Sequence, residues 1–211
     1  ISYGKQTIDQ GDIDAVVAVL RSDFLTTGPV VDAFEERLAQ KISAKYAVSC
    51  SSGTAALHIA ACSLDIKKND KVIVPSITFV ATANAVRYLG GEVIFSDVDE
   101  KSGLMKPSHL KEALDRAGSG VRAIFPVHLA GQCADMAAIA KIARDRGISV
   151  VEDASHAIGT TYKNDIGEFK VGSCAHSDMT VFSFHPVKTV AMGEGGGVST
   201  QDKQLAEKLR L

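Results

Sequence analysis

Short apolar runs of strand length alternate with segments of helical periodicity along most of this chain. Most positions in each run are apolar, which is typical of strands whose two faces are both covered by helices. Because parallel strands need long connections that usually contain a helix, this alternation predicts an α/β fold. We expect a doubly wound, mostly parallel sheet of seven strands. The predicted strands are residues 46–50, 71–74, 92–96, 122–127, 148–151, 179–184 and 198–200.

Two helices are expected before the first strand. Ile13, Val16, Val17 and Leu20 have the spacing of an amphipathic helix over residues 9–20, with Asp9 placed to cap it. The other helices are predicted at residues 31–42, from within 51–55 to 64, at 78–88, 107–117 and 136–143, and from 201 onward. The glycine- and lysine-rich segment 159–178 is assigned no helix or strand.

Composition excludes several classes of function. The 211 residues are 45% hydrophobic and carry a formal charge of −2, which fits one domain and offers no basic stripe for nucleic acid. No apolar run is long enough to span a bilayer, so no membrane partner is expected. Cys50, Cys62, Cys133 and Cys174 form no close pair, which favours reduced, buried thiols in a cytoplasmic protein over disulfides or a zinc site.

Lys188 follows the apolar run 179–184 and precedes Gly195-Gly196-Gly197. A lysine that is partly removed from water has a lowered pKa and can attack a carbonyl as the free amine. The glycines would leave room for a flat cofactor. The alternative, a surface lysine in a connection between strands, fits this stretch alone equally well.

Other candidate residues also follow predicted strands, where open α/β sheets bind ligands. In Ser52-Gly53-Thr54-Ala55, small residues at a helix start could bind an anion, although an ordinary helix cap explains the motif as well. Asp153 ends a buried run and could pair with a protonated ring nitrogen, or it could cap the following turn. His156 could orient that carboxylate or a ligand hydroxyl, or could be a half-buried structural histidine.

Two further residues complete the candidate set. Phe79 could stack on a flat ring, although an aromatic there is more often core. Ser183 lies five residues before Lys188 and could bind the same phosphate as the Ser52–Ala55 turn. An anion site, an aspartate for a ring nitrogen, an aromatic and a lysine for an aldehyde together match pyridoxal 5′-phosphate (PLP).

The chain resembles the DegT/StrS-type aminotransferases of nucleotide-linked keto sugars, which are fold-type I PLP enzymes. The residues that carry this resemblance are Gly28-Pro29, Phe34-Glu35, Ser52–Leu57, Pro75–Thr82, Asp97–Asp99, Pro126–Leu129, Glu152–His156, Ser183–Lys188 and Gly193–Gly196. The opening Tyr3–Gln6, with Thr78–Asn84, is most similar to the PseC-like branch that makes pseudaminic acid.

The resemblance implies a role for each candidate residue. Lys188 would form the Schiff base and move the proton, and Asp153 would hold the ring nitrogen protonated. Phe79 would stack on the ring, and His156 would lie near the ring hydroxyl. The phosphate would be bound by the turn at Gly53, through Thr54 and Ala55, and by Ser183. Dehydratases among the relatives have a histidine in place of this lysine, so the lysine favours amino transfer.

The resemblance also implies how the chain works as a whole. Residues 1–211 would form the large PLP-binding domain, with an N-terminal helical segment over about residues 1–42 and without the relatives' small C-terminal domain. The expected reaction moves an amino group, from glutamate by analogy, to a nucleotide-linked 4-keto-6-deoxy sugar for surface polysaccharide or glycan synthesis. A homodimer with a shared site is expected. The alternatives are a PLP-dependent sugar dehydratase and a non-catalytic domain that binds PLP or a nucleotide sugar.

Overall fold

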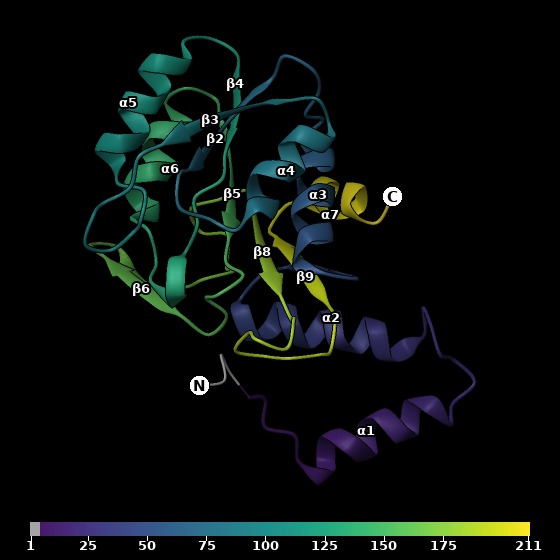
Figure 1. Ribbon diagram of the computed structural model, residues 1–211. Helices are drawn as coiled ribbons and strands as arrows, with labels where there is room; N and C mark the ends of the chain where they lie inside the picture. Colours follow the sequence, from purple (N-terminus) through teal and green to yellow (C-terminus); the bar gives the residue numbers. More distant parts are fainter. Residues whose placement is uncertain (1–4) are drawn as a thin grey trace.

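The computed structural model describes residues 5–211, which form one α/β body with a helix extending from it (Figure 1). The similarity noted at Tyr3–Gln6 lies partly outside these residues. The helices are α1 (Gln10–Leu20), α2 (Pro29–Ile42), α3 (Gly53–Ser63), α4 (Val80–Tyr88), α5 (Pro107–Ala117), the 3₁₀ turn η1 (Leu129–Gly131), α6 (Met136–Arg144) and α7 (Lys203–Leu209). The strands are β1 (Tyr46–Cys50), β2 (Lys71–Pro75), β3 (Glu92–Ser96), β4 (Val121–Ile124), β5 (Ser149–Asp153), β6 (Thr161–Asn164), β7 (Gly167–Lys170), β8 (Met179–Ser183) and β9 (Gly196–Thr200).

The predicted seven-stranded, mostly parallel sheet is confirmed. Its strand order is β1-β9-β8-β5-β4-β2-β3, and only β9 runs antiparallel to its neighbours. The four remaining pairs of neighbours, β8–β5, β5–β4, β4–β2 and β2–β3, are parallel. Helices connect β2 to β3, β3 to β4 and β4 to β5, whereas the long connection from β5 to β8 contains the hairpin β6–β7. The chain reaches the antiparallel β9 from β8 through residues 184–195, which contain no helix.

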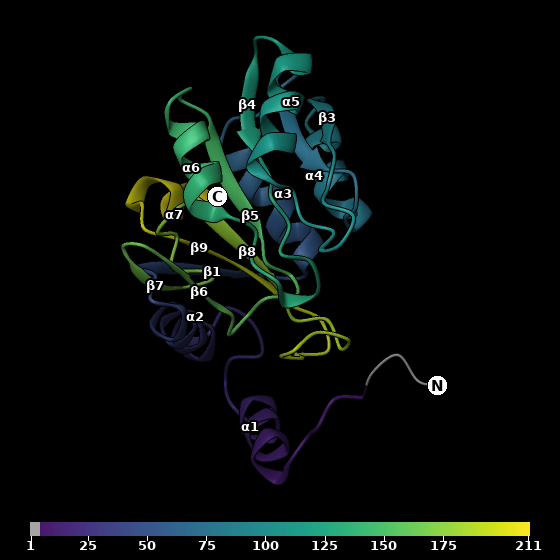
Figure 2. The ribbon, with the colours of Figure 1, turned by 90° about the vertical axis from the view of Figure 1, so that its left-hand side faces the viewer.

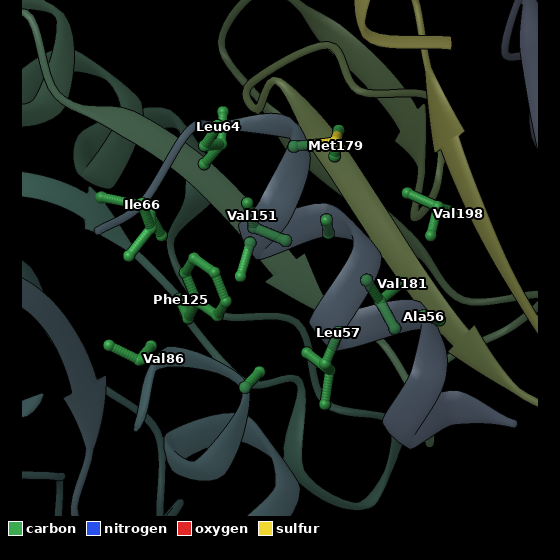
Figure 3. Close-up of a cluster of buried hydrophobic side chains, with 14 of the residues drawn as sticks. Ala56, Leu57, Leu64, Ile66, Val86, Phe125, Val151, Met179, Val181 and Val198 are labelled. Atoms are coloured by element: carbon green, nitrogen blue, oxygen red, sulfur yellow. The ribbon is translucent and has the colours of Figure 1, made fainter. Parts of the chain in front are cut away.

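Helices cover both faces of the sheet (Figure 2). On one face, α3, α4 and α7 bury Ala56, Leu57, Val86 and Leu209 against the strands in the largest hydrophobic cluster, part of which is drawn in Figure 3. On the other face, α5 and α6 form a second cluster. A third cluster packs α2 against the sheet beside β6 and β7. Burial of these apolar side chains supplies the main driving force for the fold.

The amphipathic helix expected over residues 9–20 is present as α1 with its Asp9 cap, and none of its residues is buried. Two other expectations from the sequence need correction. Residues 161–170, left without an element, form the antiparallel hairpin β6–β7. Of the four cysteines only Cys174 is buried, whereas Cys62 is exposed; all four are free thiols.

Among residues 5–211, no helix has both the length and the apolar composition needed to cross a membrane.

Candidate active site

A cavity of about 770 Å³ opens beyond the carboxyl ends of β1, β2, β5 and β8. Every predicted site residue except Ala55 lines it. The lining residues are Ser52, Gly53, Thr54, Leu57, Thr78, Phe79, Ala81, Val127, Leu129, Asp153, Ser155, His156, Ser183, His185, Val187, Lys188 and Glu194. The structure therefore gathers side chains that are separated by more than 130 positions in the sequence into one cavity.

Strand alternation explains why the key side chains share this cavity. Successive side chains of a strand point to opposite faces, so residues two apart point the same way. In β5, Asp153 faces the α3–α4 side together with Val151, and in β8 Ser183 does so together with Val181. Because Asp153 is in register with Val181, both polar side chains lie at the same end of the sheet.

The start of α3 and Ser183 form a corner suited to an anion. A Cβ built at Gly53 would lie 2.6 Å from the Cβ of Ser183, so only glycine lets the helix start approach this serine so closely. The first N–H groups of a helix have no intrahelical acceptor and favour negative charge. The Ser52 hydroxyl accepts the N–H of Ala55 at 3.1 Å, which caps the helix and uses that donor. The proposed phosphate contact of Ala55 stays a prediction, since its N–H already has this acceptor.

Asp153 is a buried carboxylate whose two oxygens both accept hydrogen bonds. Thr82 Oγ1 donates to Oδ2 at 2.7 Å, and Ser155 Oγ donates to Oδ1 at 2.7 Å. The backbone N–H of Ser155 adds a third bond, to Oδ1, at 3.2 Å. Burying a charged group is costly unless donors satisfy it, and these three donors fix the orientation of the carboxylate.

Lys188 is half-buried on the loop between β8 and β9. Burial lowers the pKa of its amine below the ordinary value, and the nearby charge of Asp153 opposes this shift only in part. A larger fraction of the side chain is therefore the uncharged amine near neutral pH than in an exposed lysine. Lys188 lies on a connection between strands, as the alternative to a catalytic lysine has it, and its side chain also lines the cavity.

His156 lies on the same cavity wall. Its Nδ1 accepts the backbone N–H of Ala130 at 3.4 Å, which assigns the hydrogen of the neutral ring to Nε2. Burial, followed by the positive charge of Lys188, lowers the pKa of His156. The ring is therefore a neutral donor near physiological pH.

Phe79 directly precedes α4 and lines the cavity with 69% of its surface exposed. It is thus not a core aromatic, and its ring is accessible to a ligand.

Sequence reasoning missed four cavity residues with polar side chains, Thr78, Ser155, His185 and Glu194, and also Thr82, which does not line the cavity but bonds to Asp153. The helix expected over residues 78–88 would place the two threonines on the same side, because residues four apart in a helix are neighbours. In the structure Thr78 precedes α4, which begins at Val80, and the two Oγ1 atoms are 2.7 Å apart. Ser155, two residues after Asp153, has the spacing at which a side-chain carboxylate accepts a local backbone N–H.

The role expected for the glycine run before Val198 was wrong. A Cβ at Gly196 would lie 2.2 Å from the backbone oxygen of Ser52, and one at Gly197 would lie 3.2 Å from Leu38. Both glycines are buried in β9. Because these glycines have no side chain, β9 packs directly against the backbone of Ser52 and against Leu38. This close packing leaves no space for a cofactor at Gly196 and Gly197.

The fold and the cavity define an α/β domain of the kind that PLP-dependent aminotransferases use to hold their cofactor. The sequence profile of the DegT/DnrJ/EryC1/StrS aminotransferase family matches residues 6–211, and the chain belongs to this family.

Relatives and solved structures of the family agree with this assignment. A UDP-4-amino-4,6-dideoxy-N-acetyl-beta-L-altrosamine transaminase from Campylobacter jejuni is 40% identical, over all of this chain and 54% of the relative. The structure of Helicobacter pylori PseC, an aminotransferase of pseudaminic acid biosynthesis, has a TM-score of 0.89 and 30% identity, over all of this chain and 54% of its own.

The PLP form of a sugar aminotransferase from Streptococcus pneumoniae has a TM-score of 0.90 and 27% identity, over all of this chain and 57% of its own. These comparisons confirm the resemblance to the DegT/StrS family and its PseC-like branch. The chain spans about half the length of the curated relatives that it matches.

Proposed function

We propose that this chain binds PLP in the cavity and forms the cofactor-binding part of an aminotransferase that acts on a nucleotide-linked keto sugar. The observation that carries the proposal is that Lys188, with its lowered pKa, shares one cavity with the buried Asp153 and with the anion corner at Gly53 and Ser183. The three groups match the aldehyde, the ring nitrogen and the phosphate of PLP.

The residues present fit this cofactor. The N–H groups at the start of α3, with the hydroxyls of Thr54 and Ser183, would hold the phosphate. Asp153 would accept a hydrogen bond from the protonated ring nitrogen, and Phe79 would cover one face of the ring. When bound, PLP supplies an aldehyde for an amine and a ring that withdraws electrons from the bond to be broken.

The chain's own side chains would then manage protons. The amine of Lys188 would take a proton from one carbon and return it to another, for which a pKa below that of an ordinary lysine is suited. His156, which carries its hydrogen on Nε2, would donate a hydrogen bond to the ring hydroxyl of PLP. Leu129 and Val187 on the cavity wall would exclude water from this proton transfer.

The nature of the substrate is proposed from the relatives. The Campylobacter relative is named as a transaminase of a UDP-linked dideoxy sugar, and the PseC structure is described as taking part in pseudaminic acid biosynthesis. We therefore propose a nucleotide-linked 4-keto-6-deoxy sugar as acceptor, glutamate as donor, and a place in glycan synthesis. The lysine at position 188 supports amino transfer over dehydration. A cytoplasmic location is part of the proposal and is supported by the four free thiols.

A homodimer with a shared site is also proposed. Ile13, Val16 and Leu20 on α1 are between 47% and 65% exposed, and no residue of this helix is buried. An 11-residue helix is only marginally stable without packing, so its apolar side needs a partner surface. Ile77 and Val80, next to the cavity residue Phe79, are exposed as well, which places apolar surface beside the cavity.

The first experiment measures cofactor binding. Purified protein is titrated with PLP, and the absorption of lysine-bound PLP is followed for the wild type, Lys188→Ala and the control Lys111→Ala, whose lysine lies exposed on α5. The proposal expects the band in the wild type and the control and its absence in Lys188→Ala. A band that persists in Lys188→Ala would contradict it.

The second experiment measures turnover. The protein is incubated with PLP, a nucleotide-linked 4-keto-6-deoxy sugar and ¹⁵N-labelled glutamate, and the product is analysed by mass spectrometry. Incorporation of ¹⁵N into the sugar supports the proposed reaction. A sugar that has lost a hydroxyl without gaining nitrogen would instead support the dehydratase.

A further inference from the structure

The carboxylate of Asp153 is oriented by a hydroxyl from a distant part of the chain. Thr82 is fully buried on α4, and its Oγ1 donates to Asp153 Oδ2 at 2.7 Å across 71 positions of sequence. The sequence alone assigned no role to this threonine.

The distances indicate which acceptor receives the hydrogen of the Thr82 hydroxyl. Thr82 Oγ1 has two possible acceptors, Asp153 Oδ2 at 2.7 Å and the backbone oxygen of Phe79 at 3.1 Å. A threonine in a helix commonly bonds the carbonyl three or four residues earlier. Here the shorter bond goes to the charged acceptor, and bonds to an ionised group are the stronger ones.

A second hydroxyl extends this interaction to the cavity wall. Thr78 Oγ1 lies 2.7 Å from Thr82 Oγ1 and lines the cavity. Because Thr82 uses its hydrogen for Asp153, Thr78 is the donor in their contact. The result is a chain of donors, Thr78 to Thr82 to Asp153, in which each bond strengthens the next.

The acceptor positions of Asp153 leave room for one more bond. An ionised carboxylate offers about four acceptor positions. Ser155 occupies two on Oδ1, and Thr82 occupies one on Oδ2. The remaining acceptor position is on Oδ2, the oxygen that already accepts the hydrogen bond from Thr82.

We propose that Thr82 is a positioning residue for Asp153, and that its hydroxyl holds Asp153 Oδ2 in the orientation that accepts a hydrogen bond from the ring nitrogen of PLP. The inference rests on the proposed function, because it requires PLP in this cavity. Thr82 does not touch the cofactor itself and acts only through the carboxylate.

The test compares PLP with an analogue in which a C–H group replaces the ring nitrogen. Dissociation constants of both are measured by fluorescence titration for the wild type, Thr82→Val, Thr82→Ser and Thr200→Val. Valine has nearly the shape of threonine and lacks the hydroxyl, whereas serine keeps it. Thr200→Val is the matched control, because Thr200 is equally buried and its Oγ1 donates to Asp178 O at 2.7 Å, away from the cavity.

We expect Thr82→Val to lose affinity for PLP and to keep its affinity for the analogue. Thr82→Val should weaken PLP binding about tenfold, the lower end for a hydrogen bond to a charged group, and change binding of the analogue less than about twofold. Thr82→Ser should restore PLP binding, and Thr200→Val should leave the ratio of the two constants unchanged. This pattern assigns the effect to the contact between Asp153 and the ring nitrogen.

Two results would overturn the inference. An equal loss for PLP and the analogue in Thr82→Val would mean that Thr82 only supports the shape of the cavity, and unaltered PLP binding would mean that its hydroxyl does nothing for Asp153. Failure of the wild type to bind PLP would overturn the proposed function, and the inference with it. Normal wild-type binding with an unaffected Thr82→Val would overturn the inference alone.

Discussion

His128 Nε2 lies 2.7 Å from Glu152 Oε2, and both side chains are buried behind the cavity wall. His128 Nδ1 accepts the backbone N–H of Ala134 at 3.2 Å, so the hydrogen is assigned to Nε2, which donates to the carboxylate. Since neighbours in a strand face opposite ways, Glu152 anchors β5 on the α5–α6 side while Asp153 faces the cavity. The pair thus fixes the strand end that carries Asp153.

Glu152→Gln should destabilise the fold by about 1–3 kcal/mol, the cost of leaving a buried hydrogen-bonding group unsatisfied. Burial raises the pKa of Glu152, but hydrogen bonds from His128, Ser177 and Thr180 outweigh burial and lower it, so the side chain is charged at neutral pH. Glutamine would remove the charge and place its NH₂ group opposite a donor, either His128 Nε2 or the hydroxyls of Ser177 and Thr180, whose hydrogen bond a carboxylate oxygen now accepts. Urea unfolding at pH 7 measures the loss.

The control for this prediction is an exposed pair. Lys163 Nζ lies 3.6 Å from Glu168 Oε2 on the β6–β7 hairpin, and both side chains are more than half exposed. Glu168→Gln should change stability by no more than about 0.5 kcal/mol. Similar losses in the two variants would show that burial of Glu152 does not set the importance of its bonds.

Gly53→Ala should weaken PLP binding and stability together. The added Cβ would lie 2.6 Å from Ser183 Cβ, so the start of α3 or the end of β8 must move. Such overpacking costs about 1–3 kcal/mol and would separate the two parts of the anion corner. Urea unfolding and PLP titration measure both effects. Gly167→Ala, where nothing lies within 4 Å of the new Cβ, should change neither; an unaltered PLP affinity in Gly53→Ala would argue against the corner as the phosphate site.

The parts of the site that depend on strand ends were predictable from the sequence. Asp153 lies two residues after the apolar run 148–151, Ser183 lies near the end of the run 179–184, and the ends of parallel strands meet at one edge of a sheet. Lys188 follows the second of these runs closely enough to reach the same edge. Period-two alternation, which the sequence shows directly, then fixes which side of the sheet each side chain faces.

The parts that depend on packing between distant segments were not predictable. Nothing in the run Gly195–Gly197 indicates that the backbone of Ser52 lies against it, and only the folded structure shows that contact. The hairpin at residues 161–170 has no clear apolar alternation. Its two aromatic side chains, Tyr162 and Phe169, stack on each other, Ile166 lies exposed at the turn, and the other side chains are polar or, at Gly167, absent. The bond between Thr82 and Asp153 likewise joins elements that are 71 positions apart.

Val16→Glu and Leu20→Glu should dissociate the proposed dimer. Both side chains lie on α1, and a charge buried at an apolar interface is costly. Sedimentation equilibrium should show a dimer for the wild type and a dissociation constant at least about tenfold higher for each variant. Ile166→Glu is the control, because Ile166 is 84% exposed at the tip of the β6–β7 hairpin. A wild type that stays monomeric at high concentration would contradict the prediction, as would equal dissociation by the control.

The amine of Lys188 should titrate at lower pH than an ordinary lysine, and Asp153→Asn should lower its pKa further. Burial is the main cause of the lowered pKa, and the negative charge of Asp153 partly opposes it by stabilising the ammonium form. Removing that charge therefore destabilises the ammonium and favours the free amine. Competitive acetylation across a pH series, with peptide mass spectrometry, follows each lysine without cofactor, and Lys111 on the exposed side of α5 serves as the internal reference. If Lys188 reacted with the same pH midpoint as lysine in an unfolded peptide, its partial burial would not activate it, and a midpoint raised by Asp153→Asn would reverse the assigned sign of the interaction.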